Sequence, residues 1–162
     1  VYKRQCRIWP LENSSQYDIP WNMLRAVIDT NILISARRSL ASASNAVIRA
    51  VDAGAFCMLA SVPLFMEYEA VLTRPEHLLA FGLSGAEVTG FLDYLAGLIE
   101  PVKLHYLWRP QLIDVADEMV LETAINGRAD CIVTFNAGHF GPASKFGVDV
   151  IPPAELLRRT KS

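Results

Sequence analysis

The chain has 162 residues, with 17 acidic and 15 basic side chains that give a formal net charge of −2. This length fits one domain that buries its own core, without disulfides or a structural metal. The near balance of charge argues against broad, non-specific coating of nucleic acid, although a local site for RNA stays compatible with it. Three cysteines without metal-ligand spacing indicate a reduced, cytoplasmic setting.

Neither a membrane span nor a signal peptide is evident. The longest charge-free apolar stretch, Ala53 to Met66, has 14 residues and contains Pro63, which is too short and too broken to cross a bilayer. Residues 1–22 mix charged, polar and aromatic side chains without a period. We expect residues 1–22 to be a disordered extension outside the domain, native or left from expression, and residues 23–160 to form the domain.

Short apolar runs alternate with amphipathic stretches along the rest of the chain, which predicts strands alternating with helices. In the first half we expect strands at 24–28 and 56–60, a helix at 30–36, a second from a cap at Ser44 or Asn45 to about 53, and a third from Ser61-Val62-Pro63 to the residue before Pro75.

The second half continues the alternation. A capping box at Ser84 and Glu87 predicts a helix to about Ile99, followed by a strand at 102–104 and a helix at 115–125 that stops at Gly127. Further strands are expected at 131–134 and 148–151, with a terminal helix at 153–159. The order predicts an α/β fold, a three-layer α/β/α sandwich with a central, mostly parallel sheet.

The apolar run Ala26-Val27-Ile28 ends abruptly at Asp29, followed by Thr30 and Asn31. Open α/β sheets bind ligands at the carboxyl ends of their strands, which is where this strand would place Asp29. The carboxyl end of this strand is therefore a suitable position for an acid that binds a metal ion. The competing interpretation is that Asp29 only caps the following helix.

Other polar residues are expected at the same edge of the sheet. Asp117 lies in the first turn of a helix, Asn136 follows a strand, and Glu67 lies one turn into a helix and can point into the same cleft. Asp114 and Glu118 flank Asp117, but acids at a helix N-terminus favour the macrodipole in any protein. Three acids and an amide, without histidine or cysteine, suit a hard cation such as Mg²⁺ or Mn²⁺ and metal-assisted hydrolysis of phosphodiesters.

Four motifs in this order resemble the PIN-domain nucleases. They are Val27-Ile28-Asp29-Thr30-Asn31-Ile32-Leu33-Ile34-Ser35, then Glu67, then Asp117 seven residues before Ala124, and then Ala129-Asp130-Cys131-Ile132-Val133-Thr134-Phe135-Asn136 followed by His139-Phe140. The chain is most similar to the branch of VapC-like toxins from toxin–antitoxin pairs. The resemblance runs from about Met23 to Leu157.

This resemblance implies an endoribonuclease that depends on Mg²⁺ or Mn²⁺, forms homodimers and is inhibited by a small antitoxin. The family's catalytic acids map onto Asp29, Glu67 and Asp117, which would also bind the metal. The fourth catalytic position, often Asp, is Asn136 here, which removes a charge and implies one metal or a weak second one. Asn31, Thr134 and Asp114 are the supporting residues, with Asn31 and Thr134 hydrogen-bonding to the metal ligands.

Arg37, Arg38 and His139 are expected substrate contacts, although a solvated arginine pair and a histidine that packs its loop explain them equally well.

Two other classes of function, a phosphatase and a dinucleotide-binding domain, are disfavoured. A haloacid-dehalogenase-like phosphatase needs a second Asp where Asn31 stands, and a dinucleotide-binding domain needs a Gly-rich turn that 30–35 lacks. The remaining alternative is a catalytically weak or inactive PIN domain that binds RNA or protein.

Overall fold

The computed structural model describes residues 23–107 and 109–161. The expected extension at 1–22, including Cys6, lies outside the described residues. Five strands form one sheet, and every pairing between them is parallel. The strands are β1 (Arg25–Ile28), β2 (Cys57–Ser61), β3 (Ile99–Val102), β4 (Cys131–Val133) and β5 (Asp149–Ile151), in the spatial order β3-β2-β1-β4-β5.

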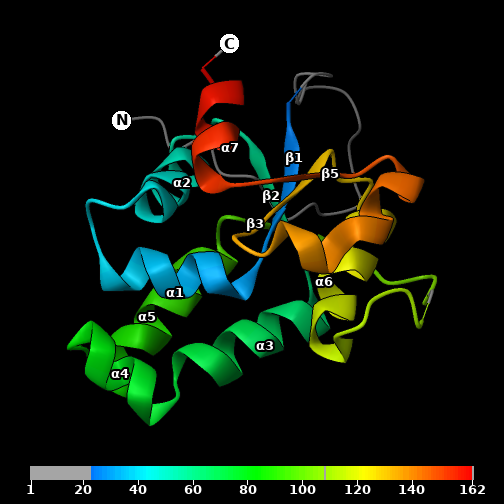
Figure 1. Ribbon diagram of the computed structural model, residues 1–162. Helices are drawn as coiled ribbons and strands as arrows, with labels where there is room; N and C mark the ends of the chain where they lie inside the picture. The colour runs from blue at the N-terminus through cyan, green and yellow to red at the C-terminus, as the bar shows by residue number, and fades with distance from the viewer. Residues whose placement is uncertain (1–22, 108, 162) are drawn as a thin grey trace, which may run out of the picture.

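Helices cover both faces of this sheet (Figure 1). The elements are α1 (Thr30–Arg38), α2 (Ala43–Asp52), α3 (Val62–Leu72), α4 (Pro75–Phe81), α5 (Gly85–Ala96), α6 (Val115–Asn126), the 3₁₀ segment η1 (Ala137–Phe146) and α7 (Pro153–Arg159). Helix α2 packs against α1 and α7, whereas α6 packs against β1, β2 and η1. From β1 to β3 the chain adds strands toward one edge of the sheet, and from β4 to β5 it adds them toward the other edge. Because the crossovers between parallel strands are right-handed, this change of direction places α6 on the opposite face from α1 and α2. The predicted three-layer α/β/α sandwich is confirmed.

The core lies where the central strand meets both helix layers. Ala26, Val27 and Ile28 of β1 are fully buried, as expected for a parallel strand covered on both faces. Cys57 and Cys131 lie on the two strands that flank β1, and both are buried. Burial raises the pKa of the Cys131 thiol to about 12, which fits the expected role of a packed apolar side chain.

Several local predictions are wrong for identifiable reasons. The N-cap of α2 is Ser42, whose hydroxyl accepts the Asn45 N–H at 3.1 Å, while Ser44 is a buried residue inside the helix. Pro75 begins helix α4 and does not only end the helix before it, because proline is well suited to the first turn of a helix. Helix α5 ends at Ala96, so β3 starts at Ile99 and pairs with Met58 of β2 three residues earlier than expected. The capping box at Ser84 and Glu87 is confirmed.

One buried tyrosine ties α3 to the end of the central strand. Tyr68 is fully buried, and its hydroxyl donates a hydrogen bond to the carbonyl oxygen of Ile28. Burial, with a smaller contribution from the charge of Asp29, raises the pKa of Tyr68 well above its ordinary value. The phenol therefore remains a hydrogen-bond donor and holds α3 beside the carboxyl end of β1.

Among the described residues, the helices are too short or too polar for any of them to traverse a lipid bilayer.

Candidate functional site at the carboxyl edge of the sheet

Asp29 lies directly after β1, at the N-cap position of α1, and only 6% of it is exposed. Its backbone N–H donates to the carbonyl oxygen of Val133 at 3.0 Å, which joins it to the end of the neighbouring strand β4. The backbone N–H groups of Thr30 and Asn31, at the start of α1, also lower the pKa of this carboxylate, so capping of the helix accounts for part of its position.

The hydroxyl of Thr134 holds this carboxylate in place. It donates to Oδ2 of Asp29 at 2.6 Å and accepts hydrogen bonds from Nδ2 of Asn31 at 3.2 Å and from the backbone N–H of Asn136 at 3.0 Å. Thr134 itself is 1% exposed. One hydroxyl group thus connects three of the residues that the sequence placed at this edge with the end of β4.

The electrostatic environment of Asp29 opposes its own charge. Burial raises the pKa of Asp29, the hydrogen bond from Thr134 lowers it, and the negative charge of Asp117 raises it again, with a net upward shift. The two carboxylates are therefore close enough to repel each other. A bound cation relieves such repulsion and favours the ionised forms of both groups.

Asp117 approaches from the first turn of α6, where its side chain is 18% exposed. Its Oδ2 atom lies 2.9 Å from Nδ1 of His139, which η1 places on the outer side of the carboxylate. Asp114 is the N-cap of α6 and accepts the Ala116 N–H at 2.9 Å, so its carboxylate serves the helix end. The helix start that carries Asp117 is thereby fixed.

The remaining predicted residues are less closely connected. Glu67 is half-buried on α3, one position before the Tyr68 anchor, and forms no hydrogen bond or ion pair with another described residue. The Asn136 side chain is exposed, and only its backbone contacts Thr134. Within the described ranges, no three His, Cys, Asp or Glu side chains are spaced to enclose a metal ion.

Arg37 and Arg38 lie at the far end of α1 from Asp29, roughly 12 Å along the helix axis at a rise of about 1.5 Å per residue. The Arg37 guanidinium stacks 4.6 Å from the ring centre of Phe91 on α5, and its buried Nε has no partner among the described residues. Arg38 is exposed. Packing against α5 accounts for Arg37 more directly than contact with a substrate.

One buried acceptor at the site lacks a partner. The Oδ1 atom of Asn31 is inaccessible to solvent and accepts no hydrogen bond from any described residue, although Nδ2 of the same amide is bound to Thr134. An orphaned buried acceptor is costly in isolation. The carboxylate oxygens of Asp29 and Asp117 are hard donors of the kind that Mg²⁺ and Mn²⁺ prefer when they keep several waters. The residues present therefore fit such an ion.

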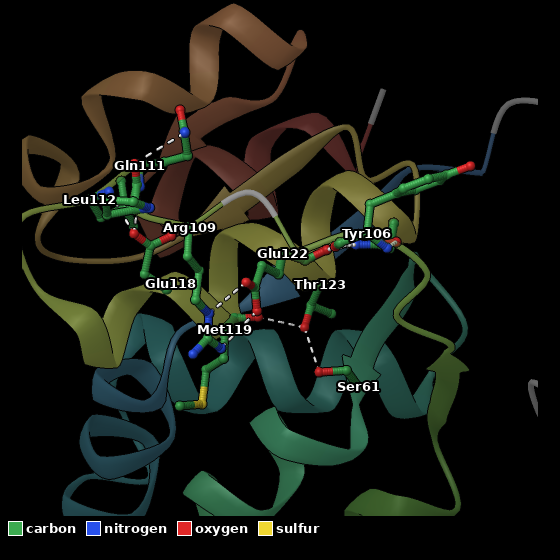
Figure 2. A network of polar contacts seen from close by, with 11 residues as sticks. Ser61, Tyr106, Arg109, Gln111, Leu112, Glu118, Met119, Glu122 and Thr123 are labelled. Carbon is green, nitrogen blue, oxygen red and sulfur yellow. Dashed lines mark hydrogen bonds and ion pairs between the residues drawn. The ribbon is translucent and has the colours of Figure 1, made fainter.

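A second group of polar side chains on α6, shown in Figure 2, was missed from the sequence. The sequence favoured the interpretation of Glu118 as an acid that stabilises a helix N-terminus through the macrodipole. It is in fact 2% exposed, and its Oε1 accepts the backbone N–H groups of Gln111 and Leu112 at 2.6 and 2.8 Å. Glu122, one turn later, binds the Arg109 guanidinium through both oxygens at 2.7 and 3.0 Å.

Asn126, another turn later, continues the same row. Its Oδ1 accepts the N–H groups of His105 and Tyr106, and its Nδ2 donates to the Tyr106 carbonyl oxygen at 2.9 Å. Residues 118, 122 and 126 are spaced by four and share one face of a helix. That spacing was the available signal that these side chains bind residues 105, 106, 109, 111 and 112 along α6. On the adjoining face, Thr123 shares a 2.7 Å hydrogen bond with Ser61, the N-cap of α3 (Figure 2).

A family model described as PIN domain matches residues 25–138, which is more than half of the chain. The chain belongs to the PIN domain family. No curated protein matches the chain. The matched region of this PIN domain includes Asp29, Glu67, Asp117 and Asn136 and ends just before His139. PIN domains are in general metal-dependent nucleases that act on RNA, so nuclease activity and a hydrolase class are supported by the family match.

Proposed function

We propose that this PIN domain is an endoribonuclease that depends on Mg²⁺ or Mn²⁺, hydrolyses RNA phosphodiester bonds and acts as the toxin of a toxin–antitoxin pair. The observation that carries the proposal is the closeness of the Asp29 and Asp117 carboxylates at the carboxyl edge of the sheet, where the charge of Asp117 raises the pKa of the buried Asp29. Such a pair suits a site whose occupant is positively charged.

Each residue has a distinct task in this proposal. Asp29 and Asp117 hold the ion, and Glu67 completes the acidic set from α3. When bound, Mg²⁺ or Mn²⁺ supplies Lewis acidity toward water and toward phosphate oxygens. Thr134 fixes the Asp29 carboxylate through the 2.6 Å hydrogen bond, so that little reorganisation is needed during the reaction.

The biological partners follow from the resemblance to VapC-like toxins. We propose an RNA substrate, a small antitoxin protein, a homodimer and a cytoplasmic location. A neighbouring open reading frame for a small protein is the observation that tests the toxin role, and the molar mass in solution tests the dimer.

Cleavage of a single-stranded RNA by the purified chain tests the enzymatic part. We expect cleavage with Mg²⁺ or Mn²⁺ and none in EDTA. Asp29→Asn should lower the rate at least about a hundredfold, as expected for loss of one charge-stabilising group at a phosphoryl centre. Asp93→Asn, which alters an exposed acid on α5, is the matched control and should leave the rate unchanged. Cleavage that persists in EDTA would contradict the proposal.

The second candidate function is a catalytically weak or inactive PIN domain that binds RNA or protein. Two observations favour it: Asn136 stands where the family often has an acid, and Glu67 forms no contact with the Asp29–Asp117 pair among the described residues. Metal titration separates the two functions. A binding module without a metal site shows no saturable heat with Mn²⁺, whereas the nuclease gives a transition that Asp29→Asn weakens.

A further inference from the structure

The peptide group between Ile28 and Asp29 is hydrogen-bonded on both sides. Its N–H, which belongs to Asp29, donates to the carbonyl oxygen of Val133 at 3.0 Å. Its carbonyl group, which belongs to Ile28, accepts a hydrogen bond from the hydroxyl group of Tyr68, and both of these residues are fully buried. The peptide plane that ends at the Cα atom of Asp29 is therefore fixed. Together with the φ angle of Asp29, −69°, this plane sets the direction in which the side chain leaves the backbone.

The Tyr68 hydroxyl group occupies a position that a sheet normally gives to a backbone N–H group. The pairing of β1 with β2 ends at Val27 and Leu59, so the carbonyl group of Ile28 lies beyond that ladder. After Ser61 the chain leaves the sheet and begins α3. Tyr68 lies about two turns into this helix, and long side chains on a helix lean toward its N-terminus. The phenol therefore reaches back to the edge of the sheet that the backbone of β2 has left.

A second hydroxyl group holds the other end of the same residue. Thr134 donates to Oδ2 of Asp29 at 2.6 Å. Thr134 follows β4, whereas Tyr68 lies on α3, which follows β2, so the two hydroxyl groups approach from the two neighbours of the central strand. One fixes the backbone that carries Asp29, and the other fixes its carboxylate. An acid that binds a metal ion benefits from both, because the ion needs its ligand oxygens at defined positions.

We propose that Tyr68 is a positioning residue: its hydroxyl group fixes the peptide group that precedes Asp29, and through it the carboxylate, in the orientation that binds a divalent cation. The inference rests on the proposed function, because it assigns Asp29 to a metal site. In this role Tyr68 acts through Asp29 and contacts neither the ion nor the RNA. Removal of a group that orients a metal ligand typically lowers metal affinity about tenfold to a hundredfold.

Tyr68→Phe tests this role, because it deletes the hydroxyl group and keeps the aromatic ring that packs in the core. Ile48→Val is the matched control: it also weakens the core, but it lies on α2, which carries none of the proposed site residues. Calorimetric titration of Mn²⁺ measures metal affinity, and urea unfolding without metal measures stability. We expect both variants to unfold at a lower urea concentration than the unaltered chain. Only Tyr68→Phe should raise the dissociation constant for Mn²⁺, by about tenfold.

A double variant tests whether the effect passes through Asp29. Tyr68→Phe alone should slow cleavage of single-stranded RNA about tenfold. Combined with Asp29→Asn, it should change the rate of that variant by less than about twofold, because the carboxylate that Tyr68 orients is already absent. A tenfold further loss in the Asp29→Asn background would mean that Tyr68 supports the whole site and not this carboxylate, which overturns the assignment.

The titration has three other outcomes. An unchanged dissociation constant in Tyr68→Phe, together with lower stability, means that the hydroxyl group only satisfies a buried carbonyl group, and it overturns the assignment. Equal weakening of metal binding in Tyr68→Phe and Ile48→Val attributes the effect to lost stability and also overturns it. If the unaltered chain neither binds Mn²⁺ nor cleaves RNA, the proposed function fails, and the role of Tyr68 fails with it.

Discussion

The hydroxyl of Thr134 donates a 2.6 Å hydrogen bond to Oδ2 of Asp29, although the two residues are 105 positions apart in the sequence. Parallel pairing of β1 with β4 brings them together, because Ile28 is in register with Val133. Both side chains are almost fully buried. The carboxylate is therefore oriented by the sheet itself, and its geometry does not depend on a surface loop.

This relationship predicts the effect of removing a single hydroxyl. Thr134→Val keeps the shape of the side chain but deletes the donor to Asp29, and we expect RNA cleavage to slow about tenfold with a loss of about 1 kcal/mol in unfolding free energy. Thr134→Ser retains the hydroxyl and should keep most of the activity. Single-turnover rates and urea unfolding of the two variants check this. Equal rates for Thr134→Val and Thr134→Ser would contradict it.

Asn136 is the residue at the site where the chain departs from a four-acid pattern. Asn136→Asp should tighten binding of divalent metal by adding a charge, whereas Asn136→Ala should weaken cleavage without abolishing it. Both variants keep the backbone N–H that binds Thr134, so the comparison isolates the side chain. Calorimetric titration of Mn²⁺ into the three proteins is the measurement. Identical midpoints would remove the Asn136 side chain from the site.

Arg109 and Glu122 form the strongest charged contact along α6. The Glu122 side chain is 1% exposed, so Arg109→Met leaves a buried carboxylate unpaired and should cost about 1–3 kcal/mol of unfolding free energy. Arg158→Met breaks an exposed pair with Glu155 and should cost less than about 1 kcal/mol. Chemical unfolding of both variants tests the difference. Equal costs would show that burial of Glu122 does not strengthen the pair.

The unfolding free energy should decrease as the pH is lowered, and protonation of Glu100 should account for part of this decrease. Burial raises the pKa of Glu100, but hydrogen bonds from Arg25 and Cys57 lower it by more, so the net shift is downward. The folded state therefore binds the proton less readily than the unfolded state. The stabilisation is complete above the unfolded pKa of about 4.3 and is lost as the pH falls through the lower folded value.

Glu100→Gln tests this pH dependence. We expect it to reduce the unfolding free energy at neutral pH and to lose that deficit progressively as the pH falls below about 4. Urea unfolding at a series of pH values measures the difference between the two proteins. A deficit that stays constant over this range would mean that the charge of Glu100 is not what stabilises the fold.

The sequence allowed prediction of the sheet because buried parallel strands are continuous apolar runs, as in Val27 and Ile28. Some caps between the strands were also readable locally, such as the capping box at Ser84 and Glu87. The position of Asp29 was predictable for the same reason. The contact between His139 and Asp117 was not, because η1 contains Pro142 and Gly141 and follows no hydrophobic period. The burial of Glu118 was also not predictable. Its partners are backbone N–H groups, which every residue except proline carries.

The position of β4 beside β1 also has a consequence for the order in which the chain is made. Strand β1 and Asp29 leave the ribosome about a hundred residues before their neighbour β4. Non-local pairing of this kind forms late, because the intervening chain must be closed into a loop first. A nascent chain that ends before β4 has neither Thr134 nor its hydrogen bond to Asp29. The site proposed here is therefore assembled only after β4 has been made and has paired with β1.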